Sequence, residues 1–201
     1  MKRLLFCFGF LFLLSTANAQ FFQGFGIMAG GTLGRQKWET QIQEPKHKYL
    51  LRYNAEIFAE FGSHQTFRWV TELQYNVKGS KREVSEGTTK YVSQYAAWNN
   101  YLMIRKELFA IIPYVKVGPR AEYVFQSDLG FKKFHLTGAA GAGVEFVAYG
   151  PVRFIAEAWW VPDLTKSLDQ ADFTVKQHAW ELRIGIKFTG RTGEACPKVY
   201  K

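Results

Sequence analysis

The chain has 201 residues, and its 26 Lys and Arg against 17 Asp and Glu give a formal net charge of +9. Hydrophobic residues make up 47% and aromatic residues 17% of the sequence, which excludes a disordered chain, a collagen and a helical membrane bundle. The basic balance by itself leaves nucleic acid open as a partner. Two Cys are too few for a disulfide framework or a multi-cysteine metal site.

The first residues have the pattern of an export signal. Lys2 and Arg3 precede an apolar run over residues 4–14, and small residues follow it up to Ala19. This pattern is typical of a secretory signal peptide, which we predict over residues 1–19. The apolar run is shorter than the roughly 20 residues of a spanning helix, so an uncleaved anchor helix is the weaker alternative. Cleavage would leave Cys196 as a lone cysteine, with no internal disulfide.

The sequence after residue 20 alternates between apolar and polar residues with a period of two. From Leu51 to Phe61 the odd-numbered positions are apolar, whereas Arg52, Glu56 and Glu60 lie at even-numbered ones. Successive side chains of a strand point to opposite faces, so this pattern predicts a strand with one apolar and one charged face. The same pattern recurs, with no charge on the apolar face, in residues 67–78, 113–125, 134–146, 152–160 and 180–188.

Two further segments alternate less regularly. Residues 25–33 have apolar side chains at odd-numbered positions, and Arg35 and Lys37 continue that parity, so we expect both basic residues at a rim beyond the membrane. Residues 94–106 place Trp98, Leu102 and Ile104 opposite Tyr101, Met103 and Arg105, with a register that the paired Ala and Asn residues blur. Eight strands are therefore expected.

Three features favour a membrane barrel over a soluble sandwich or a lipocalin-like barrel, whose strands also alternate. The strands run for about 9 to 13 residues, near the length that crosses a bilayer and above the soluble mode of roughly 5–6. Aromatic residues gather at the strand ends, as in interfacial girdles. Short connections alternate with longer polar ones; the short ones are 62–66, 107–110 and 149–151, and the long ones are 39–48, 79–92, 126–133 and 161–174.

We therefore predict an all-β protein, an eight-stranded antiparallel up-and-down transmembrane β-barrel over residues 20–188, followed by a tail over 189–201. Short periplasmic turns and longer outside loops are typical of bacterial outer-membrane barrels. Both ends of the predicted barrel lie on the side of the short turns. We expect the outer membrane as the location, with the N- and C-termini in the periplasm.

The charged residues at inward-facing positions form a predicted lumen network. Its members are Arg52, Glu56, Glu60, Arg68, Glu72, Lys78, Arg105, Lys116, Arg120, Glu122, Glu145, Arg153, Glu157, Glu181, Arg183 and Lys187. An eight-stranded barrel is only wide enough for side chains to fill, and unpaired charges in such a space would be costly. Because the basic and acidic members nearly balance, we predict an ion-paired, plugged lumen. Basic residues that point inward in an exported chain also argue against nucleic acid as a partner.

Several short motifs of strand and turn residues carry a resemblance to a known family. They are Glu72-Leu73-Gln74-Tyr75-Asn76-Val77-Lys78-Gly79, Tyr101-Leu102-Met103-Ile104, Gly118-Pro119-Arg120-Ala121-Glu122-Tyr123, Asp128-Leu129-Gly130 and Gly141-Ala142-Gly143-Val144-Glu145. Over most of residues 24–188 the sequence resembles the PorT-like family of small outer-membrane β-barrel proteins from Bacteroidota. Arg105 departs from the family, which often has Pro there. The resemblance implies an outer-membrane barrel and, since some members serve a secretion apparatus, an accessory role in a secretion or assembly machine.

One set of residues has the composition of a hydrolase site. His135, Thr137 and Glu145 are similar to the His-x-Ser pair and Glu of barrel enzymes that deacylate lipid A, and a hydroxyl activated by His is sound nucleophile chemistry. Here the hydroxyl belongs to Thr, and all three residues share the inward parity, away from lipid. A lipid A-modifying enzyme is therefore a remote alternative, and we expect a protein that is not an enzyme.

The remaining candidate sites are weaker. His47, His64 and His178 show no metal-ligand spacing, so neither a metal nor a cofactor is expected. Lys81-Arg82 and Lys132-Lys133 are basic pairs in expected outside loops, where they would contact lipopolysaccharide phosphates or remain solvated. An outer-membrane binding module that uses its extracellular loops is the alternative function. The expected partners are outer-membrane lipid, lipopolysaccharide and proteins of a secretion or assembly machine.

Overall fold

The computed structural model describes residues 21–40, 47–62, 65–84, 87–128, 131–148, 150–165, 168–169 and 173–189. Its strands are β1 (Phe22–Thr40), β2 (His47–Phe61), β3 (Phe67–Val84), β4 (Gly87–Arg105), β5 (Ile111–Ser127), β6 (Phe134–Val147), β7 (Val152–Pro162), β8 (Leu168–Asp169) and β9 (Phe173–Thr189). The predicted signal peptide and most of the predicted tail lie outside the described residues.

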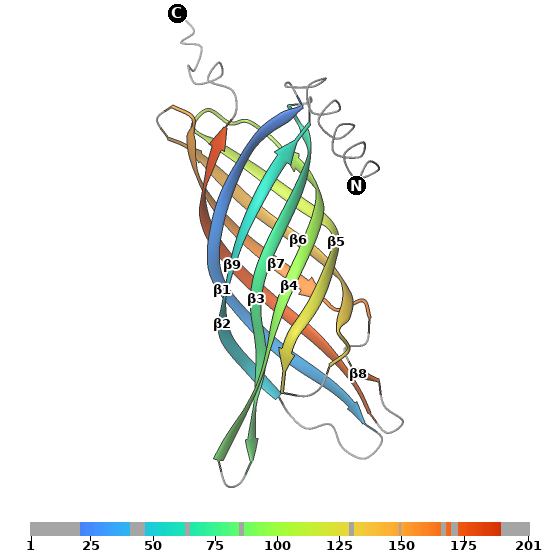
Figure 1. Cartoon of the computed structure of the whole chain (residues 1–201). Coiled ribbons are helices and arrows are strands. Elements are labelled where there is room, and N and C mark those ends of the chain that lie inside the picture. Colours follow the sequence, from blue (N-terminus) through green and yellow to red (C-terminus); the bar gives the residue numbers. More distant parts are fainter. Residues whose placement is uncertain are drawn as a thin grey trace, which may run out of the picture.

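The eight long strands close into one ring, and the short β8 only adds to the loop end of β9. Each long strand pairs antiparallel with the next one, and β9 pairs with β1 from Gly24↔Thr189 to Thr40↔Phe173. Figure 1 shows the strands winding around the barrel at a common tilt. Closure satisfies every strand edge, which hydrocarbon requires. The predicted fold, an eight-stranded up-and-down transmembrane barrel, is confirmed.

The expected partition of the two strand faces is present around the ring. In β2 the odd-numbered Leu51, Tyr53 and Ile57 are exposed, whereas Glu56 and Glu60 are buried. The same holds for β4, whose register was uncertain in the sequence. There Trp98, Leu102 and Ile104 face outward, and Tyr101, Met103 and Arg105 are buried. The apolar face is therefore the outside of the barrel, and the charged face is its interior.

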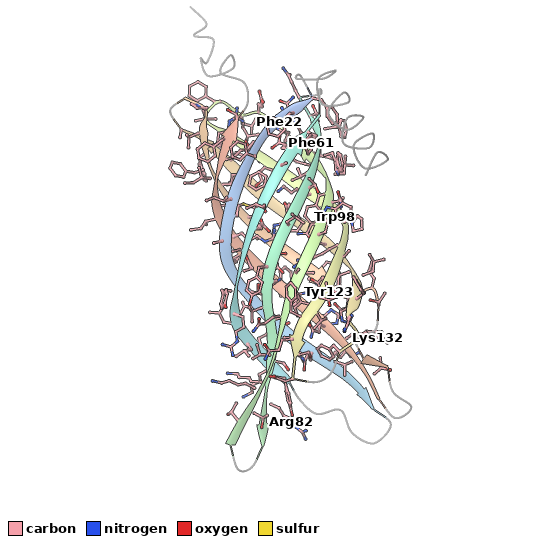
Figure 2. All side chains as sticks on the ribbon, in the orientation of Figure 1. Phe22, Phe61, Arg82, Trp98, Tyr123 and Lys132 are labelled. Carbon is pink, nitrogen blue, oxygen red and sulfur yellow. The ribbon has the colours of Figure 1, made fainter. Side chains whose placement is uncertain are left out.

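Aromatic side chains on the outer wall gather toward both ends of the barrel. On the turn side the rings of Phe22 and Trp69 lie 5.7 and 5.5 Å from that of Phe61, and Figure 2 shows Phe22 and Phe61 close together at one end. Toward the loop side Tyr123 contacts Phe134 with ring centroids 5.0 Å apart. These two belts match the interfacial girdles expected of a membrane barrel. No helix long and apolar enough to span a membrane occurs in the described part of the chain.

The loop side differs from the sequence-based expectation in its strand lengths. Residues 79–92 were expected to be a polar loop, but β3 and β4 continue as a paired hairpin up to Val84↔Gly87. Figure 1 shows this green hairpin projecting beyond the barrel wall. Beyond the membrane a strand needs no apolar face, so the alternation that reveals strands elsewhere is absent here. Arg35 and Lys37 likewise lie within β1, where they are exposed as expected for a rim.

One expected lipid-facing residue, Val77, is instead buried at 4% exposure. The register of β2 against β3 shifts between Tyr49 and Asn54, which marks a β-bulge. At this bulge β1 and β3 approach so closely that a Cβ on Gly34 would lie 2.7 Å from the carbonyl oxygen of Gly79. The Leu50 side chain of β2 lies 3.0 Å from where a Cβ on Gly79 would be, so β2 covers this short stretch of the outer face of β3.

Candidate functional site

The inward-facing charged side chains meet in the barrel interior in three clusters along its axis. The turn-side cluster consists of Glu60, Arg68, Arg105, Glu145, Arg153 and Lys187; the central cluster of Glu56, Glu72, Lys116, Glu157 and Arg183; and the loop-side cluster of Lys78, Arg120, Glu122 and Glu181. Their positions follow from strand parity and from the tilt of the strands, which sets the residues that meet across the lumen.

The turn-side cluster is centred on Glu60, which is fully buried. Its carboxylate accepts hydrogen bonds from Arg68 at 2.9 Å and from Arg105 at 3.3 Å, and Lys187 contacts its other oxygen. The ammonium group of Lys187 also bonds Glu145 at 2.9 Å. Glu145 and Glu60 are thus joined through one shared lysine, and strands far apart in the ring are tied across the interior.

Two arginines at the turn-side end reach toward the mouth of the barrel. Arg153 lies 3.1 Å from Glu145, with 13% of its side chain exposed. Arg105 contacts Glu107 at 2.9 Å in addition to Glu60, and Glu107 is 45% exposed. Ion pairing thus extends from the dry interior to the solvent edge at this end.

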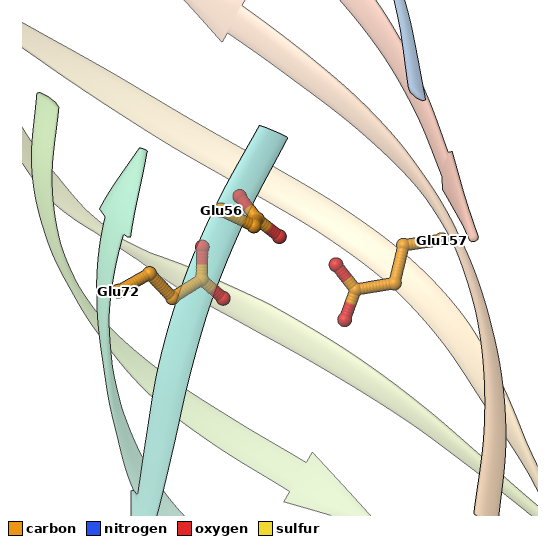
Figure 3. Close-up of side chains that lie close together, drawn as sticks. All are labelled: Glu56, Glu72 and Glu157. Carbon is orange, nitrogen blue, oxygen red and sulfur yellow. The ribbon is translucent and has the colours of Figure 1, made fainter. Parts of the chain in front are cut away.

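The central cluster brings three carboxylates together, those of Glu56, Glu72 and Glu157, whose oxygens lie within 4.8 Å of one another (Figure 3). Arg183 lies among them, with Nη1 at 2.7 Å from Glu56, 3.2 Å from Glu72 and 3.9 Å from Glu157. Lys116 contacts Glu72 at 3.0 Å and Glu157 at 2.6 Å. The place that a bound cation would take among these carboxylates is therefore held by the protein's own cations.

Uncharged inward residues complete the central cluster. The Tyr114 hydroxyl and the Trp159 Nε1–H donate to Glu157 at 2.6 and 2.7 Å. The Arg183 guanidinium lies over the Trp159 ring at 4.8 Å. Trp159 is 1% exposed and Tyr114 is 4% exposed. The sequence analysis counted only charges in the lumen, although the same parity assigned Trp159 to the inward face.

The loop-side cluster is organised by Glu181 and Glu122. Glu181 accepts hydrogen bonds from Arg120 at 3.0 Å and Asn76 at 2.6 Å, and Arg183 contacts it as well. Glu122 accepts a hydrogen bond from Lys78 at 2.6 Å and lies 2.8 Å from Arg120. Because Arg183 contacts both Glu181 and the central carboxylates, these two clusters form one connected network.

The interior changes character at the loop-side mouth, where its contacts are neutral. Asn54 donates to the Thr32 hydroxyl at 2.8 Å, and the Ser80 hydroxyl donates to Gln36 at 2.8 Å. An apolar cluster closes this end, formed by Tyr95, Val124, Phe131 and Val175. Phe131 precedes β6 and is only 7% exposed, so its ring packs into the mouth. Nothing in the sequence pattern distinguishes Phe131 from a solvent-exposed loop residue.

Most of the predicted lumen residues therefore lie together inside the barrel, with one exception. Arg52 is half-buried near the bulge of β2 and makes no ion pair with any residue that the structure describes. The bulge shifts the register around it and removes it from the shared network.

The hydrolase-like set is not assembled. His135 and Thr137 are buried inside the barrel near the loop side, and the Thr137 hydroxyl donates to the backbone carbonyl of Arg120 at 3.3 Å. Glu145 lies ten residues from His135 on the same strand, which at the usual rise is a separation of about 33 Å. Glu145 also belongs to the turn-side cluster. The described histidines do not converge either: His178 lies in β9, His47 begins β2, and His64 lies outside the described residues.

Burial makes each partner in this network dependent on the others. Removing a buried charge from water costs several kcal/mol per ion, and only close partners compensate that cost. Arg120, Arg183, Lys78 and Lys187 are each 2% exposed or less, and each contacts at least one carboxylate at hydrogen-bond distance. A network with these properties links the strands across the interior of the barrel.

Comparison with known proteins bears on the fold. No protein-family model and no curated protein sequence matches this chain. Among solved structures, Neisserial surface protein A is similar over 82% of this chain and 96% of its own, at 12% identity and a TM-score of 0.55. The outer membrane protein OprG from Pseudomonas aeruginosa is similar over 85% of this chain and 98% of its own, at 12% identity and a TM-score of 0.56.

A third structure was determined in a bilayer. The outer membrane protein AlkL in DMPC lipid bilayers is similar over 86% of this chain and 93% of its own, at 12% identity and a TM-score of 0.52. At these identities the similarity concerns the fold and extends to no activity. The chain thus has the fold of small outer-membrane β-barrel proteins.

Proposed function

We propose that this chain is a non-enzymatic, integral outer-membrane barrel whose lumen is plugged by its ion-paired side chains. The interior network supports this proposal, because its large buried side chains occupy the space through which a solute would pass. The role we favour is structural, or accessory to a secretion or assembly machine, as the resemblance to PorT-like proteins suggests. A closed barrel suits such a role, since it anchors a partner without leaking solutes.

The observation that carries the plugged lumen is the burial of Trp159, Tyr101 and Arg183 in the middle of the barrel, each at 1% exposure. The test is a planar-bilayer recording of the refolded, purified protein. We expect no stable conductance steps for the parent protein. A matched variant, Trp159→Ala, removes the largest buried ring among the residues that the structure describes, whereas Trp160→Ala removes an equal ring from the outer wall. Large, stable conductance of the parent would contradict the plugged lumen.

The accessory role and the orientation require experiments in cells. Crosslinking in intact cells followed by purification is expected to recover a defined envelope protein with this barrel. Recovery of the barrel alone, at every crosslinker length, would leave a solitary structural barrel as the better interpretation. For orientation, Cys196 of the predicted tail is expected to react with a thiol reagent only after the outer membrane is made permeable. Labelling of intact cells would place the C-terminus outside.

A second candidate function, ligand binding at the loop side, is favoured by the long β3–β4 hairpin. Lys81 pairs directly with Lys90 across this hairpin, so two like charges lie opposite one another. Like charges directly opposite one another are unfavourable unless an anion compensates them. Lipopolysaccharide phosphates would supply that compensation at the outer leaflet.

The test of this second candidate is lipopolysaccharide affinity, measured on the refolded barrel. The variant combines neutral substitutions at Lys81, Arg82, Lys90, Lys132 and Lys133. We expect its affinity to fall and the salt dependence of binding to weaken, because fewer phosphates are neutralised. Neutralising Lys106, which is exposed at the turn side, is the control. Unchanged affinity of the loop-side variant would remove this candidate.

A further inference from the structure

The outer wall carries an amide at the middle of the membrane, on β4. Trp98 and Leu102, two positions before and after Asn100, are 57% and 51% exposed, whereas its direct neighbours Asn99 and Tyr101 are buried. Asn100 therefore points outward. It is the middle outward position of β4 between Ile104 and Ala96, a stretch that matches the length of a membrane-crossing strand. Figure 2 shows its neighbour Trp98 on the wall, well away from both ends. A polar side chain at this depth is unusual.

The hydroxyl of the neighbouring Thr71 has hydrogen-bond partners within the same barrel, whereas the Asn100 side-chain amide has none among the described residues. Thr71 pairs with Asn100 across β3 and β4. Its hydroxyl accepts a hydrogen bond from Trp98 at 3.0 Å and donates to the Asn99 carbonyl at 3.4 Å. No hydrogen bond joins the Asn100 carboxamide to any other residue in the described ranges. An amide in hydrocarbon without a partner costs roughly 4–8 kcal/mol.

The β4–β5 ladder is also interrupted at this point. The register is the same at Asn99↔Arg120 and at Leu102↔Val117, but the two intervening pairs are absent. Pro119 has no N–H, so it cannot donate to the backbone carbonyl of Asn100 opposite it. The strands nevertheless stay close, because a Cβ on Gly118 would lie only 2.1 Å from that carbonyl oxygen. The β4–β5 ladder is therefore interrupted next to Asn100, whose amide side chain faces lipid.

The outward side chains beside Asn100 are Pro119 and Val117 on β5, and Ala140 follows on β6. Leu164 lies over Gly138, 3.6 Å from where its Cβ would be, so the accessible part of this wall is formed by β4 and β5. Small residues permit close approach of packed elements in membranes, and side-chain amides form hydrogen bonds between them. On the far side of the ring β9 presents Leu182 and Ile184, which are larger and entirely apolar. The two sides of the outer wall therefore differ in chemistry.

We propose that the surface around Asn100, formed by Thr71, Asn100, Val117, Pro119 and Ala140, is a self-association face that binds a second copy of this chain. Two copies inserted with the same orientation are related by a two-fold axis along the membrane normal, which brings equal depths together. Asn100 then meets Asn100. A carboxamide donates and accepts, so the two side chains can exchange two hydrogen bonds. Lipid tails offer neither donor nor acceptor.

The test is the association of the refolded chain in phospholipid vesicles, with Cys7 of the predicted signal peptide replaced by Ser. Donor and acceptor dyes on Cys196 report association by energy transfer over a range of protein-to-lipid ratios. We expect Asn100→Leu to weaken association by about tenfold, in line with the strength of such hydrogen bonds in membranes. Asn100→Gln retains the carboxamide and should retain most of the association. Ile184→Leu, on the opposite wall, is the matched control.

A crosslinking experiment identifies the occupant. In a Cys196→Ser background, Asn100→Cys is expected to give a covalent homodimer with a short bis-maleimide in native membranes, and Ile184→Cys is expected to give none. A parent protein that stays monomeric at every ratio overturns the proposal. So does Asn100→Leu associating as tightly as the parent, or a crosslink from position 100 that captures only a different protein. A heat-modifiable gel shift verifies that each variant is folded.

Discussion

Strand β9 carries two faces with opposite requirements. Leu182 and Ile184 are 63% and 71% exposed on the outer wall, whereas Glu181 and Arg183, adjacent to them in sequence, are each 1% exposed in the interior. An outward side chain contacts lipid tails, so another apolar residue of similar size serves as well. An inward charge depends on specific partners from other strands. The outer wall therefore tolerates exchange within one chemical class, while the interior tolerates little exchange at all.

The largest loss of stability is expected from replacing an interior cation that contacts several carboxylates. Arg183→Met keeps an unbranched apolar side chain but removes the charge shared by Glu56, Glu72 and Glu181. Breaking a buried pair typically costs 3–5 kcal/mol, and here three carboxylates lose a partner, so the free energy of unfolding should fall by at least about 3–5 kcal/mol. Urea unfolding in vesicles measures it. Leu182→Met, one position away and outward, should change the free energy of unfolding by less than about 1.5 kcal/mol.

The next largest loss of stability is expected when a charged residue is placed on the apolar outer wall of the barrel. Ile57 lies near the middle of the outward face of β2 and is 56% exposed. Ile57→Arg should destabilise the barrel by about 2–4 kcal/mol, because the charge lies near the bilayer midplane. Leu51→Arg, the same kind of substitution toward the loop side of β2, should cost about 0–1 kcal/mol. Equal costs at the two positions would contradict the assigned membrane depth.

The two faces also explain what could be predicted from the sequence. Parity alone assigns Leu182 outward and Arg183 inward, because strand side chains alternate wherever one side of the wall is lipid. Parity does not predict that Arg183 contacts Glu56 while Lys187 contacts Glu60, because the partners across the lumen depend on strand tilt and register. The bulge near Arg52 and the hairpin beyond Gly79 were missed for a related reason: irregular or fully solvated strand ends carry no alternation. The closure of the mouth by Phe131 leaves no periodic signal either.

A smaller effect is expected at that apolar closure. Phe131→Ala removes a ring that packs with Tyr95, Val124 and Val175. Because this site lies at the mouth, where water can enter the space left behind, we expect a cost of about 1.5–3 kcal/mol, the transfer free energy of the ring. Phe134→Ala, an outward position 74% exposed, is the control. A loss as large as that of Arg183→Met would mean that the mouth and the ionic clusters unfold as one unit.

The smallest change in the free energy of unfolding is expected when a neutral hydrogen bond, rather than an ion pair, is removed from the interior. The Ser80 hydroxyl donates to Gln36 at 2.8 Å, so Ser80→Ala should lower the free energy of unfolding by about 0.5–1.5 kcal/mol, the net worth of a hydrogen bond. Thr88→Ala, exposed on the hairpin, should stay within about 0.5 kcal/mol of the parent.

Ser80→Ala and Phe131→Ala remove contacts with different partners, so their effects should add within about 0.5 kcal/mol. Arg183→Met and Glu72→Gln share a contact, so their effects should not add. The coupling is the difference between the effect of a double variant and the sum of the two single effects. If it were as large for Ser80→Ala with Phe131→Ala as for Arg183→Met with Glu72→Gln, the mouth would belong to the ionic network.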